Sequence, residues 1–205
     1  MQGYILNINK VKDEDLIVTI LTTTSLLTLY RFYGARHSNI NIGYKIDFES
    51  VSSAKSTISM LRNVLHLGDS WMNEPRRFFV WQQFIKLLFK HLRDVEKLDS
   101  FYFELLNEIK QKFAKQNPIR VAVESYVQLL SYEGRLHDDF VCLICEELVT
   151  SELVITRSFL PAHKGCIFGE IVDKAKIEEL FLNSSTINLD DDEVDKLWKI
   201  LQEGF

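Results

Sequence analysis

The spacing of the cysteines is the feature that most constrains how this chain can fold. All three cysteines lie in one stretch, in the patterns Cys142-x-x-Cys145 and His163-x-x-Cys166. A tight turn directs both side chains of a pair to one point, so two such pairs supply four ligands for a tetrahedral Zn²⁺. The alternative is that the cysteines are small core residues and His163 is an ordinary polar residue. We favour zinc, and a closed Cys₃His set predicts a structural ion.

The composition is that of a globular protein. Of the 205 residues, 46% are hydrophobic, which is enough for a buried core, and the length suits two domains. An odd number of cysteines does not make a disulfide framework, and zinc thiolates require a reducing compartment. The sequence has neither the pattern of a signal peptide nor an apolar run of about 18 residues, so we expect no membrane partner. These features predict a cytoplasmic protein.

The charged residues are distributed unevenly. The net charge of −5 argues against a surface that is basic throughout. The first 68 residues nevertheless carry about two more basic than acidic side chains, and the remainder is acidic. A polyanion would therefore bind the N-terminal region.

The N-terminal seventy residues predict a small β-barrel. Segments 3–11, 15–23, 26–33 and 39–51 are rich in β-branched and aromatic residues or alternate between apolar and polar ones. Segment 57–67 fits a helix or a strand, and we predict a fifth strand because four strands would leave an open edge. Five such strands suit an OB-fold barrel, which we place at residues 1–70.

Within this barrel, the segment from Tyr30 to His37 interleaves aromatic and basic side chains. Aromatic rings stack on bases and cations hold phosphates, so this composition suits single-stranded nucleic acid. An ordinary barrel strand with inward aromatic and outward charged side chains has the same composition. The sequence leaves both interpretations open.

Helical periodicity dominates the rest of the chain. Asn73 or a neighbour caps a first helix with Pro75 in its first turn, and Pro118 opens a third. The apolar residues recur at helical spacing over 78–92, 98–113, 118–130, 173–182 and 190–202. We predict an α-helical domain at 71–205 with a zinc-finger-like segment at 138–170, and thus an α+β fold class.

The sequence contains no recognisable catalytic motif. It lacks a glycine-rich phosphate loop, the nucleophile elbow of serine hydrolases and the pattern of zinc deaminases. No glutamate follows His163 that could act on a metal-bound water. We therefore expect a protein that is not an enzyme, and a metal-dependent enzyme is the weakest alternative.

Several segments in order resemble the bacterial RecO family of DNA repair and recombination mediators. These are residues 3–6, 12–17, 27–36 and the glycine-containing entry to the first cysteine pair, 131–136. The chain departs from the family in being shorter than many relatives and acidic overall. It also has His163-x-x-Cys166 where four-cysteine members have a second Cys-x-x-Cys, and some members have lost the metal.

The resemblance implies binding of single- and double-stranded DNA and annealing of complementary strands at the nucleoid. It also implies partnership with RecR and the single-strand-binding protein in loading the recombinase filament. The candidate DNA-binding residues are Lys12, Arg31, Tyr33, Arg36, His37 and Lys45. The alternative is a protein–protein adaptor of the repair machinery with little DNA binding of its own.

Overall fold

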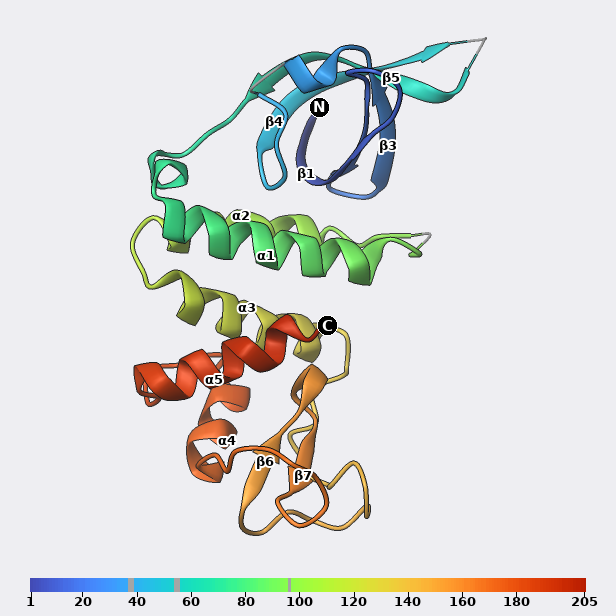
Figure 1. Ribbon diagram of the computed structural model, residues 1–205. Coiled ribbons are helices and arrows are strands. Elements are labelled where there is room, and N and C mark those ends of the chain that lie inside the picture. Colours follow the sequence, from blue (N-terminus) through green and yellow to red (C-terminus); the bar gives the residue numbers. More distant parts are fainter. Residues whose placement is uncertain (37–38, 54–55, 96) are drawn as a thin grey trace. The chain divides into compact units, whose positions relative to one another are not determined.

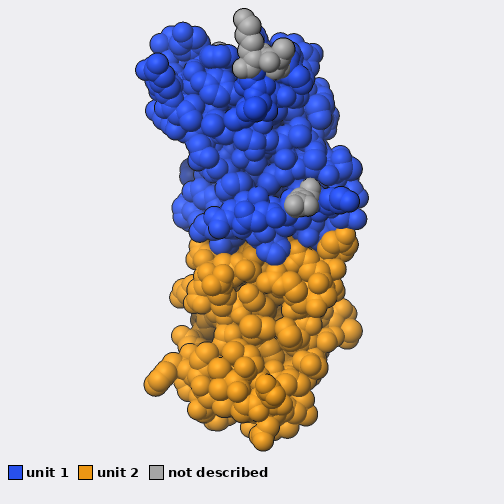
Figure 2. Space-filling model, turned by 90° about the vertical axis from the view of Figure 1, so that its right-hand side faces the viewer, with its two compact units in different colours: residues 1–115 blue, residues 116–205 orange. Residues whose placement is uncertain are grey.

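The computed structural model describes residues 1–36, 39–53, 56–95 and 97–205. The chain divides into two compact units, residues 1–115 and 116–205 (Figure 2). Across the described ranges, no helix is both long enough and apolar enough to cross a bilayer.

Unit 1 begins with a closed barrel of five strands (Figure 1). Its strands are β1 (Gln2–Lys10), β2 (Leu16–Leu21), β3 (Leu26–Arg31), β4 (Lys45–Ser53) and β5 (Ser56–His66). They close in the order β1-β2-β3-β5-β4, and only the β3–β5 pair is parallel. This order is that of an OB-fold, so the predicted α+β fold with an N-terminal five-stranded barrel is confirmed.

The fourth strand begins later than its alternating pattern predicted, at Lys45 rather than at Asn39. The preceding residues form a turn, in which the Asn41 side chain accepts from the Ile42 amide at 2.8 Å. Gly43 follows with a φ of 89°, a conformation that glycine adopts without strain. The local hydrogen bonds of this turn therefore prevail over the alternation of apolar and polar residues, and the strand begins only after the turn.

The barrel encloses an apolar core contributed by all five strands. Its buried residues are Ile5, Leu16, Val18, Ile20, Leu29, Ile40, Ile46, Phe48 and Leu61. A 3₁₀ turn of residues Gly34–Arg36 (η1) follows β3, and a second (η2, Ser70–Asn73) leads out of the barrel.

Two helices, α1 (Pro75–Leu92) and α2 (Phe101–Phe113), belong to unit 1 together with the barrel. The buried Trp81 indole of α1 donates to the Gly43 carbonyl at 2.8 Å. The Tyr4 hydroxyl of β1 donates to Asn107 of α2 at 2.9 Å. Unit 1 therefore includes both helices and extends to Lys115, and the division into domains at residues 1–70 and 71–205 stays a prediction.

Unit 2 consists of three helices and a small two-stranded sheet. Its elements are α3 (Pro118–Tyr132), β6 (Leu153–Ile155), η3 (Arg157–Phe159), β7 (Pro161–His163), α4 (Lys174–Asn183) and α5 (Asp191–Gln202). As predicted, α3 starts at a proline, and its cap Asn117 accepts from the Ile119 amide at 3.0 Å.

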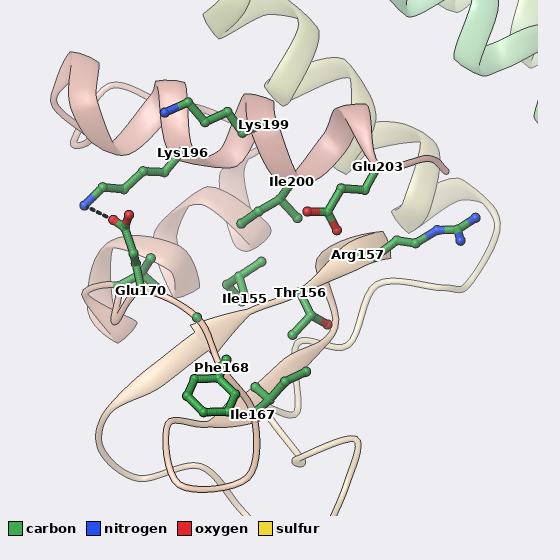
Figure 3. Close-up of a pocket in the computed structure, with 12 residues that line it drawn as sticks. Ile155, Thr156, Arg157, Ile167, Phe168, Glu170, Lys196, Lys199, Ile200 and Glu203 are labelled. Atoms are coloured by element: carbon green, nitrogen blue, oxygen red, sulfur yellow. Dashed lines mark ion pairs between the residues drawn. The ribbon is translucent and has the colours of Figure 1, made fainter.

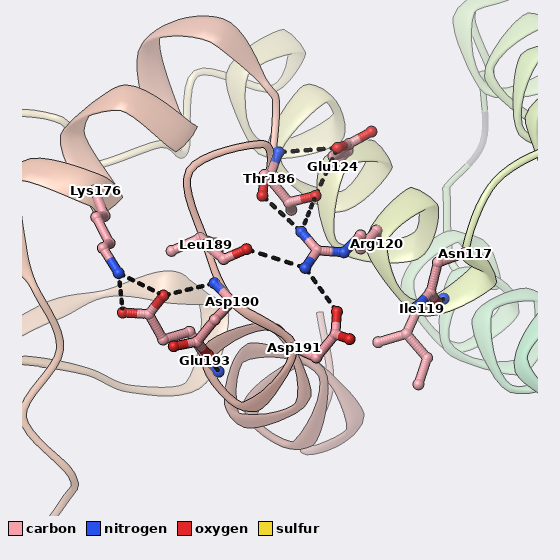
Figure 4. Close-up of polar contacts among 10 residues, drawn as sticks. All are labelled: Asn117, Ile119, Arg120, Glu124, Lys176, Thr186, Leu189, Asp190, Asp191 and Glu193. Atoms are coloured by element: carbon pink, nitrogen blue, oxygen red, sulfur yellow. Dashed lines mark hydrogen bonds and ion pairs between the residues drawn. The ribbon is translucent and has the colours of Figure 1, made fainter.

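A single arginine on α3 holds the α4–α5 connection (Figure 4). The Arg120 guanidinium donates to the Thr186 carbonyl at 2.7 Å, the Leu189 carbonyl at 3.0 Å and the Asp191 carboxylate at 2.7 Å. Next to it, the acidic run that opens α5 forms a capping box between Asp190 and Glu193. The acidic run therefore has a structural role at the start of α5, where negative charge also complements the helix dipole.

Candidate metal centre and nucleic-acid interface

The structure brings the two predicted ligand pairs of unit 2 together. The ligand atoms of Cys142, Cys145, His163 and Cys166 all lie within 4.8 Å of one another. These separations are close to those in a tetrahedron with bonds of about 2.0–2.3 Å. The four residues, which we call the metal cluster, are thus compatible with zinc.

Backbone turns place each pair of the metal cluster. The first pair lies in a narrow hairpin, where the Cys142 amide donates to the Glu147 carbonyl and the Glu146 amide donates to the Cys142 carbonyl, both at 2.9 Å. The second pair begins with His163, the last residue of β7, and the Cys166 amide donates to the His163 carbonyl at 3.0 Å. Each x-x spacing therefore closes a turn, as the sequence predicted.

The imidazole of His163 is oriented for metal binding. Its Nδ1 lies 3.4 Å from the Cys145 sulfur, and its Nε2 lies 3.3 Å from the Leu148 carbonyl oxygen. In the neutral tautomer with its proton on Nε2, the imidazole donates to this carbonyl and directs the Nδ1 lone pair toward the Cys145 sulfur. A histidine ligand whose second nitrogen is held by a carbonyl is the usual arrangement around a protein-bound metal.

The thiols of the metal cluster influence one another's ionisation. Burial opposes ionisation of Cys142, but hydrogen bonds from the backbone of Cys145, Ile144 and His163 outweigh it and lower the pKa of this thiol to about 6. Burial and hydrogen bonds with the neighbouring thiols raise the pKa of Cys166 to about 11. An ion bound by the cluster would favour the thiolate form of its cysteines.

In unit 1, the carboxylate of Asp15 organises the turn that follows β3. It accepts from the Tyr30 hydroxyl at 2.5 Å and from the Tyr33 amide at 2.7 Å. These two hydrogen bonds, that of Tyr30 first, lower the pKa of Asp15. Gly34 packs so closely that a Cβ would come within 2.7 Å of Leu16 Cδ1. The turn of residues Gly34–Arg36, which we call the Gly34 turn, is therefore tightly built.

Three of the predicted DNA-binding residues lie near this turn with exposed side chains. Lys12 is exposed in the β1–β2 connection, and the Arg36 guanidinium lies 5.3 Å from the centre of the exposed Tyr33 ring. Arg36 also forms an ion pair with Glu14, so its charge is partly compensated. The predicted residue His37 lies outside the described residues.

The other two predicted DNA-binding cations are held by partners on other elements. The Lys45 ammonium donates to Asn107 of α2 at 2.8 Å and lies 5.2 Å from the centre of the Phe103 ring. Arg31 is half-buried, and its guanidinium donates to the Leu61 carbonyl of β5 at 3.0 Å. Partners in α2 and β5 thus hold these two cations, and the DNA-binding role of the predicted residues stays a prediction.

Two side chains that the sequence analysis did not single out lie beside Arg31. Phe32 is 53% exposed, and Arg62 of β5 is exposed as well. Phe32 lies in an aromatic segment, where the sequence pattern does not distinguish it from its neighbours, and Arg62 lies about thirty residues away in the sequence. Only the pairing of β3 with β5 brings them together.

A cavity of about 280 Å³ lies in unit 2 between β6, α5 and the loop before α4 (Figure 3). Ile155, Ile167 and Ile200 give it apolar walls, and Lys196 pairs with Glu170 at its edge at 2.7 Å. None of the residues predicted to bind metal or DNA lines it. The cavity is therefore separate from both candidate sites.

The barrel is the part of the chain that matches a known protein family. A five-stranded barrel that closes in this order defines an OB-fold. Residues 1–72 match the family model described as RecO N terminal. The match covers about a third of the chain, and over these residues the chain is similar to the RecO N-terminal domain, as the resemblance of the sequence indicated. No curated protein matches the chain.

Proposed function

We propose that this protein is a non-enzymatic mediator of DNA repair and recombination that acts in the cytoplasm, at the nucleoid. It binds single- and double-stranded DNA and promotes annealing of complementary strands. With RecR, it loads the recombinase onto strands covered by the single-strand-binding protein. The observation that carries the proposal is the coincidence of the RecO N-terminal match with the closed barrel.

The chemistry of the barrel surface supports DNA as the ligand. Lys12 and Arg36 are exposed cations close to the exposed Tyr33 ring, and rings of this kind stack on bases while cations hold phosphates. The proposal assigns these three residues to the DNA interface. It leaves Lys45 out, because the Lys45 ammonium is engaged by Asn107.

Salt dependence tests DNA binding directly. We expect the affinity for a fluorescently labelled oligonucleotide, measured by anisotropy, to fall steeply between about 50 and 200 mM salt, because phosphate contacts release counterions. Strand annealing in the presence of single-strand-binding protein is the functional readout. Absence of binding at low salt, with and without RecR, would contradict the proposal.

A second candidate is a repair adaptor that recognises RecR and binds little DNA. It is favoured by the engagement of Arg36 with Glu14 and of Lys45 with Asn107, which leaves fewer free cations on the barrel. Co-purification with RecR without annealing activity would support the adaptor over the mediator.

For unit 2, we propose a structural Zn²⁺ held by Cys142, Cys145, His163 and Cys166. The support is the convergence of four ligand atoms and the carbonyl that orients His163. Four protein ligands leave no position for a catalytic water. Elemental analysis of protein purified without chelator should give about one zinc per chain by this ligand count, and a value near zero would contradict the assignment.

A further inference from the structure

A surface pocket on the barrel lies where β3 runs beside β5. Its volume is about 250 Å³, and its lining comes from the end of β3, the residue that follows it and the middle of β5: Tyr30, Arg31, Phe32, Met60, Leu61 and Arg62. The two strands are parallel, with Tyr30 opposite Met60, so the residues that follow on each strand also lie side by side. The pocket therefore combines two arginines with an exposed phenylalanine.

The two arginines lie close together without an anion. Arg31 is bound to the Leu61 carbonyl through one terminal nitrogen, and its Nε is buried with no hydrogen-bond partner. Burial and then the charge of Arg62 lower the pKa of Arg31. Arg62 itself makes one weak contact, at 3.8 Å, to the Met60 sulfur. Over the described ranges neither arginine has an ion-pair partner.

The carboxylate opposite Arg62 on β4 is bound by another side chain. Glu49 lies opposite Arg62 in the β4–β5 register, but the Asn63 side chain donates to its carboxylate at 2.7 Å. Two neighbouring guanidinium groups without an anion repel each other, and a buried N–H without an acceptor is unfavourable. An anion between them would relieve both costs, and phosphate oxygens suit the donor geometry of arginine.

The phenylalanine is held as a platform beside these charges. The Phe32 ring is 53% exposed, and the Tyr30 ring packs edge-on against it at 4.9 Å between centres. Tyr30 is itself fixed through its hydroxyl by Asp15 at 2.5 Å. A ring supported on one side and open on the other can stack on an unpaired base.

We propose that this pocket is a nucleotide subsite for a single strand, in which Arg31 and Arg62 bind one phosphate and Phe32 stacks on a base. The inference rests on the proposed DNA-binding function and adds to it the residues that select single strands. Bases in a duplex are stacked on each other, so Phe32 contributes to single-strand binding alone. Arg62 contributes to both, because a phosphate is present in both ligands.

The test compares two variants of the pocket with two matched controls on α1. Arg62→Gln and Phe32→Leu alter the pocket, whereas Arg76→Gln and Phe79→Leu alter exposed residues of the same types, Phe79 being 56% exposed. Affinity for a labelled oligo(dT) is measured by anisotropy over a range of salt concentrations. Thermal unfolding of each variant verifies that it is folded.

We expect Phe32→Leu to weaken binding of oligo(dT) about tenfold with an unchanged salt dependence, and to leave duplex binding within about twofold. Arg62→Gln should weaken binding of both ligands about tenfold and reduce the slope of log affinity against log salt by about one. Both controls should stay within about twofold of the wild type, because neither residue lines the pocket.

Two results would overturn the subsite while the proposed function stands: wild-type affinity in both pocket variants, or equal losses in pocket variants and controls. If the wild-type protein binds no DNA at low salt, the proposed function fails, and the subsite fails with it.

Discussion

The metal cluster of unit 2 and the cations around the Gly34 turn of unit 1 both come from short stretches of chain, but only the metal ligands converge. Four ligand atoms lie within 4.8 Å of one another in the metal cluster. In unit 1, Arg36 of the Gly34 turn pairs with Glu14, whereas Lys45 of β4 binds Asn107 of α2. The predicted metal ligands therefore form one site, but these predicted DNA-binding cations have separate partners.

The difference reflects what each ligand demands. A metal ion requires several atoms at one point, and turns between close neighbours in the chain achieve this. A polyanion instead contacts cations that are spread over a surface, and each cation can find a local partner as the chain folds. Spacing is therefore informative for a metal site and less informative for a nucleic-acid surface.

Loss of the metal cluster should have the largest effect. Because structural zinc contributes about 10 kcal/mol of apparent folding free energy, Cys142→Ser should lower the free energy of unfolding by several kcal/mol before it changes DNA affinity. Thermal unfolding with and without EDTA measures this. Ser151→Ala, at an exposed position of the same segment, is the control. Unchanged stability in EDTA would show that the cluster holds no structural ion.

The close packing of the Gly34 turn gives the next largest effect. In Gly34→Ala the new Cβ would meet Leu16 and Arg31 at 2.7–2.9 Å, and such overpacking costs about 1–3 kcal/mol. In Gly165→Ala, between His163 and Cys166, the new Cβ would meet no atom within 4 Å, so the free energy of unfolding should not change. Urea unfolding compares the two. Equal stability of both variants would mean that the turn adapts more freely than its packing indicates.

The ion pair of Arg36 with Glu14 should affect DNA affinity more than stability. The Arg36 side chain is 65% exposed, so Arg36→Ala and Glu14→Gln should each change the free energy of unfolding by no more than about 0.5 kcal/mol. Arg36→Ala should weaken oligonucleotide binding about threefold, and Glu14→Gln, which frees Arg36, should strengthen it by a similar factor. A large loss of thermal stability in Arg36→Ala would instead indicate a structural arginine.

The smallest expected effect is the pH dependence of the stability of the Gly34 turn. Hydrogen bonds from Tyr30 and then Tyr33 lower the pKa of Asp15 below its ordinary value of 3.8. The stabilisation is therefore fully present above that ordinary value and is lost as the pH falls through the folded-state pKa. An NMR titration of the Tyr33 amide should show its midpoint below 3.8, and Asp15→Asn should abolish it. A midpoint above 3.8 would contradict these hydrogen bonds.

Much of the fold was predictable because its signals are local. Pro75 and Pro118 start helices where their fixed φ favours it, and Asp190 caps α5. The ambiguous segment 57–67 forms a strand, β5, as the need to close the barrel edge indicated. The start of β4 differed from the alternating pattern, because local hydrogen bonds form a turn at residues 41–43, and the Trp81 indole of α1 binds the Gly43 carbonyl in addition.

The sequence by itself determined the five strands, the helices and the four converging ligands, because periodicity, caps and turn spacing act between near neighbours. Only the tertiary structure decided which cations are free. It paired Arg36 with Glu14, set Lys45 against α2, and placed Arg62 beside Arg31 and Phe32. These contacts join residues far apart in the chain or partners that many side chains could supply, so their outcome depends on how the barrel closes.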